Sequence, residues 1–129
     1  FMAEMTIKKR PKNLDLTTIQ LPLPGKVSIL HRVSGAGLFL FLPVILWLFS
    51  ASLTSAETFA TFKSVFASLP AKFIMAGLIW AFVHHACAGI RFLLLDMHIG
   101  IEKEEARKSA AVVLAVSIPL TLVLWGVLL

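Results

Sequence analysis

The sequence predicts an all-α membrane protein with three transmembrane helices. Of its 129 residues, 58% are hydrophobic and the mean hydropathy is +0.89, whereas soluble domains are about 45–50% apolar. Three long runs lack Lys, Arg, Asp and Glu, and they cover residues 33–56, 73–90 and 109–129. A helix needs about 20 apolar residues to cross a bilayer, so we expect helices at about 27–53, 69–95 and 107–128. These make one membrane domain, 27–129, after an N-terminal segment, 1–26.

The positive charges are divided unevenly between the two ends of these helices. Ten of the twelve Lys and Arg residues precede the first run or lie between the second and third, and only Lys63 and Lys72 lie between the first and second. The positive-inside rule therefore predicts a cytoplasmic N-terminus and second loop, and a C-terminus outside. Membrane topology thus accounts for the net charge of +5, and we expect no nucleic-acid partner. The single cysteine, Cys87, excludes an intrachain disulfide and a thiolate cluster.

The N-terminal segment, 1–26, is polar and basic, and prolines at 11, 22 and 24 interrupt it. Each proline lacks a backbone N–H and fixes its φ, so a continuous helix is not expected here. The composition leaves open whether this cytoplasmic segment is a tail without fixed structure or lies against a soluble partner.

Three polar side chains gather where the first helix begins. Ser28 and Arg32 are four residues apart and share a helix face, with His31 close to it. A hydroxyl and a guanidinium suit the carbonyl of a quinone, which gains negative charge on reduction. The alternative is that Arg32 extends to lipid phosphates. Ser34, Gly35 and Gly37 follow, and such small residues allow another helix to approach closely.

The loop after the first helix contains phenylalanines at helical spacing. Phe59, Phe62 and Phe66 surround Lys63, which indicates a short amphipathic helix. Such a helix could lie on the outer membrane surface or pack on the bundle, and the pattern leaves both open.

Two adjacent histidines, His84 and His85, lie deep in the second apolar run. Ionisable groups in a membrane segment are costly and usually face a cavity, a cofactor or a partner helix. Neighbouring residues of a helix point in different directions, so the two rings cannot both face one cofactor. Gly89 leaves room for a flat macrocycle one turn after His85, and Ala88 does nearly the same for His84. Haem ligation by one histidine and interhelical hydrogen bonds by both remain open here.

Among the polar groups that follow, a structural role is favoured for Asp96, and the role of Arg91 stays open. Arg91 could pair with Asp96, a lipid phosphate or a cofactor carboxylate. The loop that contains His98 is hydrophilic and should be a solvated cytoplasmic face without chemistry. The third helix has no charge and is expected to be a lipid-facing scaffold, with Trp125 in an interfacial aromatic belt.

Two motifs in this order resemble the signatures of the cytochrome b subunits of succinate dehydrogenase, the large membrane anchors of respiratory complex II. The first motif joins a basic, proline-containing stretch to the start of the first helix: Arg10-Pro11, Asn13-Leu14-Asp15-Leu16 and Ser28-Ile29-Leu30-His31-Arg32-Val33-Ser34. The second motif consists of His85, Gly89, Ile90, Arg91 and Asp96. The three-helix pattern of that family spans almost the whole chain.

The resemblance implies that His85, not His84, is one axial ligand of a haem b iron, and that a second anchor subunit supplies the other histidine. It implies that Ser28 and Arg32 line a ubiquinone site next to the iron–sulfur subunit, with His31 near the haem propionates. Two departures occur. Lys12 stands where an aliphatic residue is usual, and Phe92 stands where many relatives have a second histidine, so any role of that histidine is absent here.

The expected function is therefore that of a membrane anchor in a succinate:ubiquinone oxidoreductase of the bacterial inner membrane. Its expected partners are the second anchor, the iron–sulfur subunit, the flavoprotein subunit and membrane lipids, in a heteromeric helix bundle. The chain has no Rossmann glycine fingerprint or cysteine cluster, so it would not oxidise succinate alone. The alternatives are the anchor of a quinol:fumarate reductase, or a haem-free structural membrane subunit.

Overall fold

The structure, a computed structural model, describes residues 20–129, which form four α-helices and no strand. In chain order the helices are α1 (Leu23–Thr54), α2 (Ala56–Ala67), α3 (Leu69–Asp96) and α4 (Lys103–Leu128). Residues 1–19, with the motif at 10–16 and most of the expected cytoplasmic segment, lie outside the described part.

Three of these helices are long and apolar enough to cross a membrane. α1, α3 and α4 have 32, 28 and 26 residues. At about 1.5 Å per residue, even the shortest is about 39 Å long, which exceeds a hydrocarbon core of about 30 Å. The predicted all-α membrane fold is therefore confirmed for the part of the chain that the structure covers.

The helix α1 begins at Leu23, ahead of the start expected at 27. Pro22 is the N-cap and Pro24 lies in the first turn. The N–H groups of a first turn have no partner within the helix, so proline loses no hydrogen bond there. The helix α4 likewise begins at Lys103 rather than 107, because Glu104 and Glu105 in its first turn favour the positive end of the helix dipole.

The short helix α2 is fixed at its start by a reciprocal cap. The Thr58 N–H donates to Ser55 Oγ at 3.1 Å, and the Ser55 N–H donates to Thr58 Oγ1 at 3.0 Å. Phe62 lies between Phe59 and Phe66, with ring centroids 6.3 Å and 4.4 Å away. Phe62 and Phe66 line a cavity beside α1 and α3, so these two rings pack towards the bundle.

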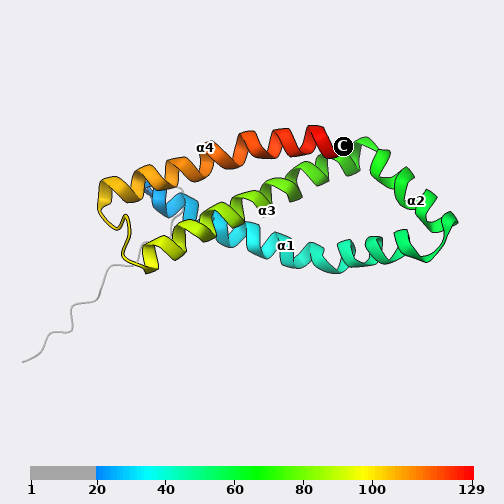
Figure 1. The fold of residues 1–129 in the computed structure, drawn as a ribbon, viewed down its shortest axis with the longest axis horizontal. Coiled ribbons are helices and arrows are strands. Elements are labelled where there is room, and N and C mark those ends of the chain that lie inside the picture. The colour runs from blue at the N-terminus through cyan, green and yellow to red at the C-terminus, as the bar shows by residue number, and fades with distance from the viewer. Residues whose placement is uncertain (1–19) are drawn as a thin grey trace, which may run out of the picture.

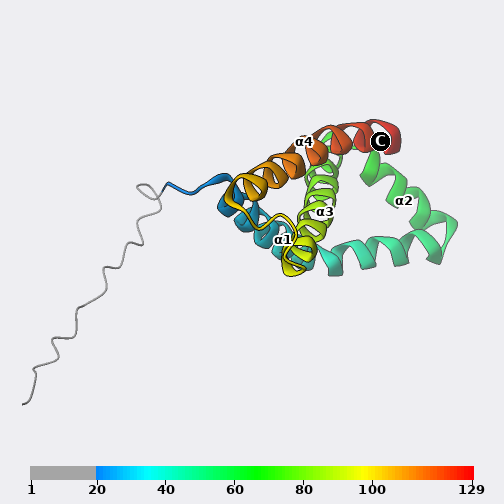
Figure 2. The ribbon, with the colours of Figure 1, turned by 60° about the vertical axis from the view of Figure 1, so that its left-hand side comes forward.

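The helix α3 lies in the middle of the arrangement (Figure 1). α4 runs along α3, and α1 crosses α3. The second half of α1 diverges from α3, and α2 connects the separated ends, so three sides of a triangle are seen in Figure 2. Apolar residues of all four helices line a cavity of about 650 Å³ in this region.

The closest packing joins α3 to the start of α1 and to α4. Val27, Ala88, Ala110 and Val113 form a buried apolar cluster there. Along α4, the buried residues recur at helical spacing: Ala110, Val113, Ser117 and Thr121. One face of α4 therefore packs on the bundle, which corrects the expectation of a purely lipid-facing scaffold. The sequence did not reveal this packed face of α4, because the opposite, lipid-facing side of the helix is apolar too.

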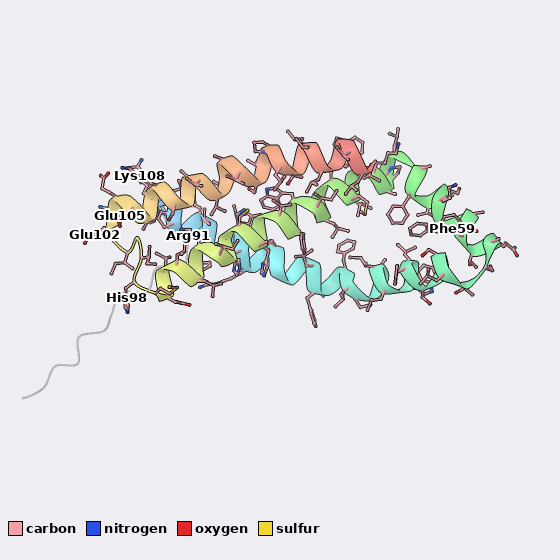
Figure 3. The ribbon with its side chains drawn as sticks, in the orientation of Figure 1. Phe59, Arg91, His98, Glu102, Glu105 and Lys108 are labelled. Carbon is pink, nitrogen blue, oxygen red and sulfur yellow. The ribbon has the colours of Figure 1, made fainter. Side chains whose placement is uncertain are left out.

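Charged residues gather at the end of the bundle that holds the α3–α4 turn (Figure 3). Glu102, Glu105 and Lys108 lie there, far from Phe59 at the opposite end. His98 and Gly100 have positive φ values of 58° and 71°, which let the chain reverse direction within a few residues. This end corresponds to the side that the sequence assigns to the cytoplasm.

The other end of α4 is tied to α3 by Trp125. Its Nε1–H donates to the Lys72 carbonyl at 2.9 Å, and its ring lies 6.0 Å from that of Phe73. Trp125, which was expected in an aromatic belt, therefore also joins α4 to α3.

Candidate functional site

The side chain of His85 on α3 lies against one turn of α1. Its Nδ1 is 3.1 Å from the carbonyl oxygen of His31 and 3.3 Å from Oγ of Ser34. The ring is partly exposed, whereas Ser34 is buried. The contact therefore holds one side of the imidazole and leaves another side open.

The hydrogen bonds around this ring assign its tautomer. The Ser34 hydroxyl donates to the His31 carbonyl at 2.9 Å, so its lone pairs remain for His85. A carbonyl oxygen only accepts. Both neighbours of Nδ1 are thus acceptors, and Nδ1 must carry the ring proton. A neutral imidazole in this form has its lone pair on Nε2.

The ring of His31 completes the contact between α1 and α3. It stacks on the His85 ring with centroids 4.0 Å apart and 7° between the planes. Phe92 meets it edge-on at 5.1 Å. A Cβ at Gly89 would lie 3.8 Å from His31 Nε2, so Gly89 faces the imidazole of His31.

Gly35 also lies close to the His85 ring. A Cβ at this position would lie 2.8 Å from Cε1 and 3.2 Å from Nδ1 of His85. The sequence predicted that another helix approaches α1 closely at Ser34, Gly35 and Gly37. The structure shows the His85 imidazole of α3 at Ser34 and Gly35, whereas a Cβ at Gly37 would have no neighbour within 4 Å. The roles of Ser34 and Gly35 beside His85 were missed, because the sequence does not show which residue of α3 faces them.

His84 has an entirely different environment. Its side chain is 0% exposed, and Trp80 stacks on it with a centroid distance of 4.8 Å. Neither ring nitrogen has a hydrogen-bond partner within residues 20–129. The two adjacent histidines therefore point to different surroundings, as their helical geometry requires.

The candidate quinone residues lie in the first turns of α1. Ser28 is partly buried and Arg32 is exposed. Residues 28–35 rise about 10 Å along the axis of α1, so one short stretch carries both side chains and the neighbours of His85.

Arg91 connects α3 to α4 and is 5% exposed. Its Nε donates to Ser109 Oγ at 2.9 Å, and its Nη2 donates to the Ala106 carbonyl at 3.1 Å. Among the residues described, its hydrogen-bond partners therefore lie on α4 and do not include Asp96. The sequence could not predict this, because the pairing of α3 with α4 sets the register.

Residues 20–129 contain no group of three or more His, Cys, Asp or Glu side chains arranged to hold a metal ion.

Residues 6–124 match the family described as succinate dehydrogenase/fumarate reductase transmembrane subunit. The chain belongs to this family. It is similar to three proteins named succinate dehydrogenase cytochrome b556 subunit. The one from Coxiella burnetii is 37% identical over 120 residues, which cover 92% of this chain and 95% of that protein. The one from Paracoccus denitrificans is 34% identical over 119 residues, 92% of each chain. The one from Rickettsia felis is 29% identical over 119 residues, 91% of each.

The family predicted from the two motifs is confirmed, and the match covers nearly the whole chain. With three helices long enough to cross a membrane, the chain is a multi-pass membrane-anchor subunit of the succinate dehydrogenase family.

Proposed function

We propose that this chain is the cytochrome b anchor of a succinate:ubiquinone oxidoreductase. In this role it binds haem b together with a second anchor subunit and forms part of the ubiquinone-reduction site. Support comes from its relatives, which are named cytochrome b556 subunits, and from the local chemistry of His85.

The observation that carries the proposal is the pair of acceptors at Nδ1 of His85, from which we infer that this nitrogen carries the proton. Metal-binding histidines usually donate their second ring N–H to a carbonyl or carboxylate, which fixes the tautomer and makes the metal-facing nitrogen more basic. The His31 carbonyl and Ser34 Oγ provide such acceptors at 3.1 Å and 3.3 Å. Nε2 then has a lone pair for an iron atom, so the residues present fit a haem. When bound, the haem supplies a one-electron carrier.

Burial distinguishes the two adjacent histidines. A haem shared with another subunit must reach its ligand from outside this chain. His85 is partly exposed and meets this condition, while His84 is fully enclosed by its own helices. We therefore assign His85 as the axial ligand and give His84 no role in ligation.

The stacked ring of His31 is proposed to lie at the propionate edge of the haem. It lies 4.0 Å from the His85 ring, so it borders the region that the macrocycle would occupy. Phe92 packs edge-on against it where many relatives have a second histidine. The imidazole of His31 is therefore the polar group of this pair available to a carboxylate.

The proposed quinone site uses the first turns of α1. The Ser28 hydroxyl would donate a hydrogen bond to one quinone carbonyl and orient the ring. The exposed Arg32 guanidinium would stabilise the negative charge that develops on the oxygen as electrons arrive. A fixed positive group is effective here because it needs no reorganisation during the reaction.

The electrons for this reaction would come from outside the chain. We propose that a flavoprotein subunit oxidises succinate and that an iron–sulfur subunit passes the electrons to the quinone. The charged end of the bundle with residues 97–108 would face these subunits from the cytoplasmic side of the bacterial inner membrane. The second anchor subunit and lipids would cover the apolar helix surfaces.

Two other functions are weighed against this one. The anchor of a quinol:fumarate reductase shares the family, but the names of the relatives favour the succinate direction. In a haem-free structural subunit the hydrogen bonds of His85 to α1 would only join the two helices, and the relatives named cytochrome b556 subunits favour haem binding instead.

The test is a reduced-minus-oxidised absorption spectrum of the purified complex, with wild type compared with His85→Ala and His84→Ala. We expect a low-spin b-type signal in the wild type. It should disappear or change form in His85→Ala, because the iron loses an axial ligand, and persist in His84→Ala.

The outcomes separate the three functions. A signal that depends on His84 and not on His85 would reject the ligand assignment. The absence of a b-type signal in the wild-type complex would favour the structural subunit. The physiological direction is read from the ratio of succinate oxidation to fumarate reduction with matched quinones.

A further inference from the structure

We propose that Ser34 and Gly35 of α1 are positioning residues that fix the tautomer and the orientation of the His85 ring, and thereby how this ring would hold a haem iron. This inference rests on the proposed assignment of His85 as a haem ligand. Neither residue touches the iron, and both act through the imidazole.

The first feature that positions His85 is a pair of hydrogen-bond acceptors on one turn of α1. The His31 carbonyl and the Ser34 hydroxyl both lie within hydrogen-bonding distance of the same nitrogen, Nδ1. Ser34 also donates to that carbonyl, so its own orientation is determined. The arrangement holds Nδ1 in its protonated form and restricts rotation of the ring about its bond to Cβ.

The second feature that positions His85 is the absence of a side chain at Gly35. Carbon atoms in van der Waals contact are about 3.5–4.0 Å apart, and a Cβ here would be 2.8 Å from His85 Cε1. Glycine therefore lets the ring come close to the α1 backbone at a place where a Cβ would push it away. The stacked His31 ring covers one face of the imidazole and limits its movement in that direction.

The consequence of a Cβ depends on whether the iron is bound. In the absence of a haem, His85 is the end of a side chain and could turn away from the new methyl group. If Nε2 were bound to iron while Nδ1 is hydrogen-bonded to α1, the ring could not turn without weakening either the bond to iron or the hydrogen bond. A substitution at Gly35 should therefore alter the haem more than the fold.

Gly37 provides a matched control on the same helix. A Cβ at Gly37 would have no neighbour within 4 Å. Gly37→Ala and Gly35→Ala make the same chemical change and the same change in helix propensity. Only the second places a methyl group against His85.

The experiment compares the purified wild-type complex with its Gly35→Ala and Gly37→Ala variants. The readouts are the electron paramagnetic resonance g-values of the oxidised low-spin haem, which report the orientation of the axial rings, and the haem content per flavin after gel filtration. We expect shifted g-values and a several-fold loss of haem in Gly35→Ala only. A Gly35→Ala spectrum that superimposes on the wild type would overturn the inference, as would an equal change in Gly37→Ala.

A second pair of variants covers the case in which Gly35→Ala assembles poorly. His85→Ala removes the ring that the new methyl group would meet. The double variant Gly35→Ala/His85→Ala should then yield as much complex as His85→Ala alone, because the two positions interact with each other. A lower yield of the double variant would mean that Gly35 serves α1 itself, which would contradict the inference.

Failure of this inference and failure of the proposed function give different results. A wild-type complex without a b-type signal would remove the proposed function and this inference together. A wild-type signal that depends on His85 but is indifferent to Gly35→Ala would remove only the positioning role.

Discussion

Arg32 is the exposed cation of α1 nearest to the His31–His85 contact in the chain. If it stabilises charge on the quinone, Arg32→Ala should lower ubiquinone reduction by about 10²-fold, the usual effect of removing one such group. Oxidation of succinate by an artificial dye should stay close to wild type, because that reaction precedes the quinone site. Both rates are measured on the same purified complex.

Lys26 is the control for this prediction, because it is another exposed cation at the start of α1. Lys26→Ala removes the same charge and should leave both rates nearly unchanged. Equal losses in the two variants would mean that net positive charge, and not a specific contact of Arg32, supports quinone reduction.

The histidines at 84 and 85 show how strongly a single step along a helix changes the environment of a side chain. His85 lies at a partly open surface with acceptors on one nitrogen. His84 is enclosed, is 0% exposed and stacks on Trp80.

At the scale of elements, the join between α3 and α4 depends on the buried guanidinium of Arg91. Ser109→Ala would leave its Nε without the acceptor at 2.9 Å. An unsatisfied buried donor costs about 1–3 kcal/mol, so the variant should lower the apparent Tm of the purified complex. Thermal unfolding followed by circular dichroism measures this.

Ser64 is a suitable comparison, since it is an exposed serine within α2. Ser64→Ala brings the same small gain in helix propensity without touching Arg91. If Ser109→Ala and Ser64→Ala unfold at the same temperature, the hydrogen bond to Ser109 does not contribute to the packing of α4.

Across the whole molecule, the proposed topology can be tested with one cysteine at each end. Lys63 and Lys103 are both exposed and are expected on opposite sides of the membrane. In a Cys87→Ser background, a membrane-impermeant maleimide should label Lys63→Cys in intact spheroplasts. It should label Lys103→Cys only after the membrane is opened, since ten of the twelve cations are predicted inside.

Labelling in inverted membrane vesicles is the complementary control, because the order of reactivity should reverse. Reaction of Lys103→Cys in intact spheroplasts would show that the orientation is opposite to the proposal.

The outer surface of the bundle is apolar over most of its length. Phe39, Leu40 and Trp47 on α1 are 74%, 72% and 70% exposed. A soluble protein could not leave such side chains in water, whereas lipid tails and partner helices cover them without loss. The second half of α1, which diverges from α3, is therefore suited to a membrane, where lipid or a partner helix covers it.

Much of this protein could be predicted from the sequence alone. The three uncharged runs determine the number of spans, since a helix in lipid must satisfy its own backbone groups and needs a minimum length. The two motifs identify the family, and the step of about 100° between neighbouring helical residues separates His84 from His85. These conclusions need only local geometry and composition.

Other features were decided only by the tertiary structure. The hydrogen bonds of Arg91 to α4, the buried stripe of α4 and the contact of Gly35 with His85 depend on where two helices cross and in which register. In water, hydrophobic periodicity would reveal the packed face of a helix. In a membrane the lipid-facing side is equally apolar, so the sequence determines which residues share a face, and the packing of the helices decides what that face meets.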